Sequence, residues 1–125
     1  MKRIINSTNA PAPIGPYNQA VLVENTLYIS GQIALDANTG ELEMSDIKVE
    51  TKKVMDNLGA ILNEVGADYS NIVKCSIFVS DMNNFNAINE VYANYFSENF
   101  PARETVEVSC LPKKVNVEIS AIAVL

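Results

Sequence analysis

The chain has 125 residues, of which 48% are hydrophobic and 19% charged, a composition that excludes a disordered protein and predicts a single domain spanning residues 1–125. Its formal net charge of −6 argues against nucleic acid or anionic lipid as a partner, because phosphate binding depends on Lys and Arg. The absence of His excludes a His-based catalytic triad and His metal ligands, so we expect no metal site.

The first part of the chain predicts a rigid loop and two strands. Residues 10–16 contain three Pro and one Gly, so we expect an ordered loop that directs Tyr17. Short apolar runs at Ala20–Val23 and Leu27–Ser30 are typical of strands, and Glu24–Thr26 indicates a hairpin loop between them.

A long amphipathic helix is predicted over Ile47–Val65, where apolar residues recur at a spacing of three or four. Ser45 or Asp46 is placed to cap its start, and Gly66 stands where a C-terminal cap belongs. A second, shorter helix is expected over about 83–96, with a largely aromatic apolar face. That face consists of Phe85, Ile88, Tyr92, Tyr95 and Phe96.

Three further stretches alternate between apolar and polar residues and predict strands at 72–79, 105–110 and 115–124. In the first, one face consists of Val73, Cys75, Ile77 and Val79. In the last, one face consists of Val115, Val117, Ile119, Ala121 and Ala123. The predicted order is ββαβαββ, an α+β fold in which two helices pack on one face of a mixed sheet. The mixed polar and apolar character of the other face favours a self-associating subunit.

The termini and the cysteines suggest a cytoplasmic protein without a membrane partner. No long apolar run follows Lys2 and Arg3, so no signal peptide is predicted, and no stretch approaches the roughly 20 apolar residues of a membrane span. Cys75 and Cys110 are the only thiols. We expect both to be reduced core residues rather than a disulfide or a reactive nucleophile.

Two charged residues lie at positions that packing alone does not explain, and they are candidates for a functional site. Arg103 follows Phe100–Ala102, and its guanidinium is suited to hold a carboxylate through two hydrogen bonds. The alternative is a solvated arginine paired with Glu104 or Glu107. Glu118 lies in a run almost free of charge, either on a wetted face or in a cleft, where it could act on water as a general base.

Two uncharged residues are weaker candidates for a pocket. Tyr17 is either a packed aromatic residue or a substrate contact, and Asn89 is either an exposed helix residue or a donor and acceptor at a pocket edge. Ser30–Gln32 matches neither a phosphate-binding loop nor a nucleophile elbow.

Five short motifs occur together in this sequence, and Asn89 precedes Val91-Tyr92 between them. The pattern closely resembles the RidA family, also called YjgF/YER057c/UK114, over residues 9–125. Each motif is weak alone, whereas five in register are specific. The motifs are Ile14-Gly15-Pro16-Tyr17, Ser30-Gly31-Gln32, Phe100-Pro101-Ala102-Arg103, Leu111-Pro112-Lys113 and Val117-Glu118-Ile119.

The resemblance implies a chorismate-mutase-like fold and a homotrimer with clefts between subunits. It also implies 2-iminobutanoate/2-iminopropanoate deaminase activity, which converts reactive 2-imino acids to 2-keto acids without a cofactor. Arg103 matches the family's arginine that holds the substrate carboxylate, and Glu118 matches the glutamate that positions the attacking water. The expected substrate-binding residues are Tyr17, Ser30, Gly31, Asn89, Arg103 and Thr105.

Two residues depart from the family pattern, which commonly has Ser after the tyrosine and usually has a small residue such as Ser after the arginine. Asn18 follows Tyr17, and Glu104 follows Arg103, where a carboxylate could compete for the guanidinium. Strand alternation predicts that Glu104 points away from Arg103. Two other functions are considered. One is a non-catalytic small-molecule binder or chaperone-like regulator using the same cleft. The other is an endoribonuclease or translation inhibitor, as some family members are labelled, against which the acidic charge argues.

Overall fold

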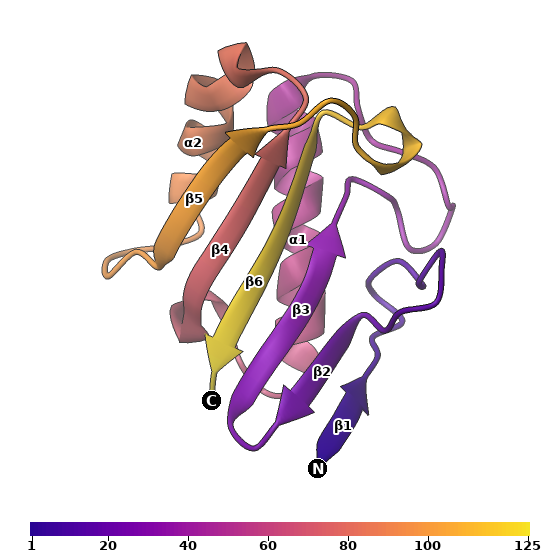
Figure 1. Cartoon of the computed structure of the whole chain (residues 1–125), viewed down its shortest axis with the longest axis vertical. Coiled ribbons are helices and arrows are strands. Elements are labelled where there is room, and N and C mark those ends of the chain that lie inside the picture. The colour runs from indigo at the N-terminus through magenta and orange to yellow at the C-terminus, as the bar shows by residue number, and fades with distance from the viewer.

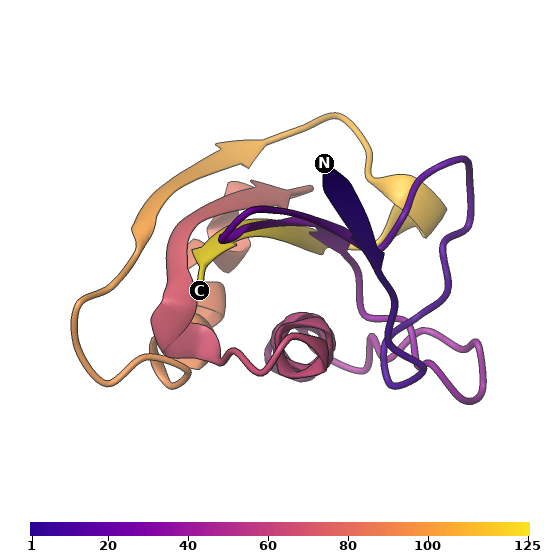
Figure 2. The ribbon, with the colours of Figure 1, turned by 90° about the horizontal axis from the view of Figure 1, so that it is seen from below.

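Six strands form one mixed sheet, and both α-helices cover the same face of it (Figures 1 and 2). The computed structural model describes residues 1–125. The strand order is β1-β2-β3-β6-β4-β5, and only β4 and β5 pair in parallel. The predicted α+β class with two helices on one face is confirmed. The elements are β1 (Lys2–Ile5), β2 (Ala20–Val23), β3 (Thr26–Gln32), α1 (Ile47–Glu64), β4 (Ile72–Val79), α2 (Phe85–Ala93), β5 (Ala102–Glu107) and β6 (Val117–Val124).

The structure has one strand more than the predicted order ββαβαββ. The additional strand is β1, which lies before the predicted elements. This edge strand pairs with β2, from Lys2 opposite Val23 to Ile5 opposite Ala20. Of its residues only Ile5 is buried, so the sequence carries no alternation that would reveal a strand. The observed order is therefore βββαβαββ.

The predicted inner face of β4 is wrong at one residue. A bulge between Ile72 and Lys74 interrupts its pairing with β6. Ile72 is therefore buried, whereas Val73 is 47% exposed. Cys75, Ile77 and Val79 face the core as expected.

The ends of several other elements also differ from prediction, by one residue at α1 (Ile47–Glu64) and by one or two at β3 (Thr26–Gln32). The second helix begins with a 3-10 turn, Met82–Asn84, and its α-helical part ends at Ala93. β5 begins at Ala102, earlier than the sequence indicated, because it pairs with β4 from Lys74 opposite Ala102 onward. A 3-10 turn at Pro112–Lys114 delays the start of β6 to Val117.

The long helix has the caps that the sequence indicated. The Asp46 carboxylate accepts a hydrogen bond from the Val49 N–H at 2.9 Å. At the other end Gly66 adopts φ +73°, the left-handed conformation that ends many helices. These caps set where α1 begins and where it ends.

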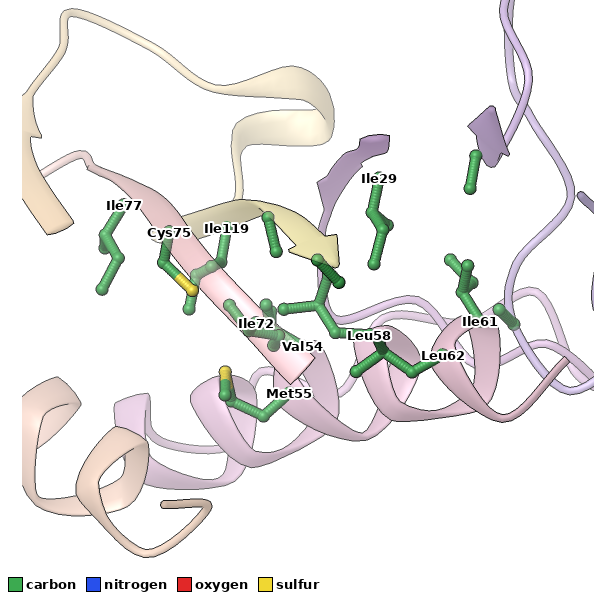
Figure 3. Close-up of a cluster of buried hydrophobic side chains, with 14 of the residues drawn as sticks. Ile29, Val54, Met55, Leu58, Ile61, Leu62, Ile72, Cys75, Ile77 and Ile119 are labelled. Carbon is green, nitrogen blue, oxygen red and sulfur yellow. The ribbon is translucent and has the colours of Figure 1, made fainter. Parts of the chain in front are cut away.

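The core fills the space between α1 and the sheet (Figure 3). Met55, Leu58 and Ile61 of α1 are fully buried against β4 and β6 residues such as Ile119. Cys75 belongs to this core, and burial raises the pKa of its thiol. Cys110 was expected in the core as well, but it is exposed and lies beyond the end of β5. Both thiols are free.

The face of the sheet opposite the helices carries exposed apolar side chains. Tyr28 on β3, Val106 on β5 and Val124 on β6 are 49%, 41% and 43% exposed. Ile122, the partner of Tyr28 in the β3–β6 ladder, lies on the same face. We refer to this surface, which Glu118 shares, as the open face. None of the helices is both long and apolar enough to span a bilayer.

Candidate functional site

Four of the predicted site residues line one cavity of about 340 Å³. The cavity lies between the proline-rich loop of residues 11–17, the end of β3 and the start of β6. Its polar groups include Tyr17, Ser30 and Glu118, and Gly31 forms part of its wall. Ile14, Ile33 and Leu35 provide apolar surface. The cavity can therefore accept a small molecule with a short apolar part.

The loop that carries Tyr17 is held by the buried side chain of Gln19. Its Oε1 accepts the Ser7 N–H at 2.6 Å, and its Nε2 donates to the Ser7 and Pro11 carbonyls at 3.0 and 2.9 Å. The Tyr17 hydroxyl accepts the Ile14 N–H at 3.2 Å. Ser30 Oγ donates to the Asn18 carbonyl at 2.7 Å, which ties β3 to the same loop. The residues around Gln19 in the sequence do not indicate this role.

Glu118 projects from β6 onto the open face because its neighbours Val117 and Ile119 are buried on the helix side. It pairs with Phe78 of β4, and on the other side it lies against Gly31. The β3–β6 ladder is irregular between Ile29 and Gln32, so Gly31 lies in the irregular part. Burial raises the pKa of the Glu118 carboxyl, and no other group is responsible for the shift.

Gly31 leaves the space that the Glu118 carboxyl group occupies. A Cβ at this position would lie 2.7 Å from both Cδ and Oε2 of Glu118, closer than real contacts allow. We expect Gly31→Ala to move the carboxylate out of place and to lower the turnover of any reaction that uses it by about 10- to 100-fold. Stability should change little, because the end of a flexible side chain can shift. Turnover and thermal melting measured on the same samples check this prediction.

Gly15→Ala is a matched control in the same cavity region. A Cβ there would meet the Tyr17 ring at 3.5 Å, an ordinary contact. This variant should keep nearly the wild-type rate. Wild-type turnover in Gly31→Ala would show that the position of the Glu118 carboxylate is not critical.

Arg103 projects from β5 onto the helix side of the sheet. It pairs with the core residue Cys75 in the β4–β5 ladder, and its Nη1 donates to Asn89 Oδ1 of α2 at 2.8 Å. The guanidinium carbon lies 5.1 Å from the ring centroid of Tyr92 and 5.6 Å from that of Phe85. Arg103 takes part in none of the four ion pairs of the structure. Asn89 and the two rings therefore orient the guanidinium group, and no carboxylate neutralises its charge.

Phe85 and Tyr92 were expected only as core residues of the second helix. Together with Asn89 they stand at positions i, i+4 and i+7, so they share one face of α2, and β5 lies against that face. A cavity of about 280 Å³ beside them is lined by Asn89, Tyr92 and Arg103, and also by Phe100. The spacing was visible in the sequence, but nothing there indicated which strand the helix would meet.

Glu104 does not compete for the guanidinium. It lies on the opposite side of β5, where it hydrogen-bonds with Ser76 and forms an ion pair with Lys74 at 3.0 Å. Both contacts lower the pKa of Glu104, the one with Ser76 most strongly. Glu107, the other suggested partner of Arg103, instead accepts the Met82 N–H at 2.7 Å.

Thr105 lies two residues after Arg103 and on the same side of β5, opposite Ile77 of β4. Its hydroxyl oxygen is buried and has no hydrogen-bond partner. It is therefore a candidate polar group beside the arginine rather than in the cavity that holds Glu118.

The predicted site residues thus form two groups that one chain does not bring together. Tyr17, Ser30 and Gly31 line the same cavity as Glu118, whereas Asn89 and Thr105 lie beside Arg103. β4 separates the two strands, and the two charged side chains leave opposite faces of the sheet. No cluster of three His, Cys, Asp or Glu side chains suited to a metal ion is present.

Comparison with known proteins shows close relatives over the full length. The family model described as endoribonuclease L-PSP matches residues 7–125. The human 2-iminobutanoate/2-iminopropanoate deaminase is 45% identical over 99% of this chain and 90% of its own length. YyfA of Yersinia pestis, a Rid family protein, is 45% identical, with a TM-score of 0.97 and full coverage of both chains. Escherichia coli TdcF, solved with bound serine, is 38% identical, with a TM-score of 0.94 and 98% coverage of both chains. The chain therefore belongs to the endoribonuclease L-PSP family, the RidA (YjgF/YER057c/UK114) family that its motifs resemble.

Proposed function

We propose that this protein hydrolyses small 2-imino acids, such as 2-iminobutanoate and 2-iminopropanoate, to 2-keto acids and ammonia. The active site lies between two copies of the chain in a homotrimer, with Arg103 from one copy and Glu118 from the next. The observation that carries the proposal is the presence of two incomplete half-sites. One is a guanidinium without an ion-pair partner on the helix side, and the other is a partly buried carboxylate on the open face.

The two half-sites suit the two ends of a 2-imino acid. The Arg103 guanidinium donates two hydrogen bonds to the substrate carboxylate. Asn89 and the rings of Phe85 and Tyr92 hold the guanidinium in place, and no carboxylate of the chain pairs with it. The short aliphatic part of the substrate fits the apolar wall of the cavity that holds Glu118. In the proposed site the C=N carbon lies between the two charges.

The chemistry needs only water and these side chains. Glu118 accepts a proton from water as the water oxygen bonds to C2 of the iminium, which gives a tetrahedral carbinolamine. Glu118 then passes this proton to the nitrogen, and the C–N bond breaks as the C2 carbonyl forms. Glu118 accepts the proton of the C2 hydroxyl in this step and returns it to solvent after ammonia has left. An iminium carbon is already electrophilic, so orientation of the water and the substrate supplies much of the required rate gain.

The relatives support this assignment. The human relative is named as a deaminase of these two imino acids, and TdcF has been crystallised with serine, which carries an α-carboxylate of the kind proposed to bind Arg103. The exposed apolar residues of the open face, Tyr28, Val106 and Val124, favour contact with another copy. The direct test is release of ammonia from freshly generated 2-iminopropanoate by the purified protein.

Mixing two inactive variants tests the shared site. Arg103→Ala and Glu118→Gln should each lose activity alone. In oligomers reassembled from equal amounts, half of the copies retain Glu118 and half retain Arg103. Random neighbours then rebuild about one quarter of the sites, so about a quarter of the wild-type activity should return. Ammonia release after co-refolding, with sedimentation to count the copies, checks this.

The same mixing experiment can contradict the shared site. No recovery, although sedimentation shows mixed oligomers, would mean that both residues act from one chain or that one of them is not required. A monomer that retains full activity would also exclude a site between copies.

The description of the family model also names an endoribonuclease, which is the second function to test. This chain has nine Lys and Arg against fifteen Asp and Glu, and four of its lysines are paired with carboxylates. A protein of this charge offers little for a phosphate backbone. RNA cleavage that persists through rigorous purification and that is lost in Arg103→Ala would favour this function instead.

A further inference from the structure

Glu50 is a fully buried carboxylate that the proposed reaction does not use. It lies in the first turn of α1, has no exposed surface and takes part in none of the four ion pairs. A buried charge without a counter-ion is expensive unless hydrogen bonds satisfy it. Its partners therefore indicate what it is for.

All hydrogen bonds that the Glu50 carboxylate accepts come from Asn116 and Val117, where the chain enters β6. Oε2 accepts the backbone N–H groups of Asn116 and Val117 at 2.7 and 3.3 Å, and Oε1 accepts Asn116 Nδ2 at 2.8 Å. Asn116 is also bound on its other side, because its carbonyl accepts the Ser80 N–H at 3.1 Å. The carboxylate thus joins α1 to the two residues that precede Glu118.

The chain that enters β6 is strained at this point. Lys113 and Lys114 both adopt positive φ, at 55° and 57°, a conformation that disfavours residues with a Cβ. A segment of this kind persists only where its surroundings hold it. The three hydrogen bonds to Glu50 fix the chain from two residues after Lys114 onward.

Near Glu118, β6 is paired regularly with β4 but not with β3. On one side Glu118 pairs with Phe78 of β4, but the ladder with β3 is irregular between Ile29 and Gln32. A shift of one residue would turn Glu118 toward the helix side and away from Gly31. An anchor at Asn116 and Val117 opposes this shift.

We propose that Glu50 is a positioning residue, which ties the start of β6 to α1 and so fixes the Glu118 carboxylate beside Gly31. This inference rests on the proposed function only where it concerns turnover. The position of Glu118 itself can be measured whether or not the protein is a deaminase.

Glu50→Ala in the assembled protein should lower kcat for 2-iminopropanoate by about 100-fold, the usual effect of displacing a reacting group by about 1 Å. The affinity for 2-oxobutanoate should stay within about twofold, because Arg103 and Asn89 belong to other elements. Thr51→Ala is the matched control. Thr51 is equally buried and adjacent, but its hydroxyl bonds only to the Ile47 carbonyl of its own helix.

NMR titration of ¹³C-labelled glutamate side chains gives a second measurement, with Glu118 assigned from the Glu118→Gln spectrum. Burial raises the pKa of Glu118, so a carboxylate released into solvent should titrate closer to the usual value for glutamate. We expect this change in Glu50→Ala and not in Thr51→Ala. If Glu50→Ala does not fold, Asn116→Ala removes one of the three hydrogen bonds from the other side and should show a smaller change in the same direction.

A folded Glu50→Ala variant with wild-type kcat, or with an unchanged Glu118 titration, would overturn the positioning role. If the wild-type protein shows no deaminase activity but Glu50→Ala still moves the Glu118 titration, the proposed function fails and the positioning role stands.

Discussion

Arg103→Ala is expected to lower kcat/KM for 2-iminopropanoate by about 1,000-fold and to remove detectable binding of 2-oxobutanoate. Each hydrogen bond to a charged group contributes about 1.5–3 kcal/mol, and a two-point contact loses two of them. About 4 kcal/mol corresponds to three powers of ten in rate. The loss should be large because nothing else in the helix-side cavity carries positive charge. Ammonia release and calorimetric binding of 2-oxobutanoate check the two effects.

Two further variants separate the charge of Arg103 from its shape. Arg103→Lys keeps the charge but loses the planar fork and its stacking on Phe85 and Tyr92, so it should recover only a small part of the rate. Arg3→Ala removes the only other arginine, an exposed residue of β1, and should keep the wild-type rate. An Arg103→Ala protein that is folded and as active as the wild type would remove the guanidinium from the mechanism.

The sequence predicted much of the fold because its strongest signals are local. The apolar spacing of α1, the Asp46 cap and Gly66 all agree with the structure, as does the alternation of β6. The failures share another cause. β1 buries only Ile5, and Val73 is displaced by a bulge against β6. Both features depend on pairing with another strand, which a local pattern does not reveal.

The site was predicted by residue type but not by arrangement. The alternation of side chains along a strand predicts that Glu104 and Arg103 point to opposite sides of β5, and the structure confirms this. The relation of Arg103 to Glu118 could not be obtained in this way. It depends on β4 lying between β5 and β6, and on which face the helices cover. Both are properties of the assembled sheet.

The opposed faces also explain why the two charges do not meet within one chain. If they did, Arg103 and Glu118 would form an ion pair, and a substrate carboxylate would have to break it before binding. Separating them by a sheet keeps the guanidinium free, and Asn89 orients it through a neutral hydrogen bond. In the assembly that we propose, the guanidinium of one copy binds the substrate whose C=N carbon faces the carboxylate of the next.

Glu118→Gln is expected to lower kcat by about 100- to 10,000-fold, the range typical of removing a general base, while 2-oxobutanoate still binds. The amide fills the same space beside Gly31 but accepts no proton from water at neutral pH. Retained binding with lost turnover is the result that distinguishes an enzyme from a binder that uses the same cleft. Parallel measurement of ammonia release and 2-oxobutanoate affinity checks it, with the exposed Glu43→Gln as a control that should behave as wild type.

The pH dependence gives the same residue an independent signature. Burial raises the pKa of Glu118, so its carboxyl takes up a proton at a higher pH than an ordinary glutamate does. Protonation removes the base, and wild-type kcat should therefore fall as the pH decreases through that raised value. The residual activity of Glu118→Gln should lack this acidic limb, because an amide does not titrate there. An identical acidic limb in the variant would assign the titration, and with it the role of the base, to another group.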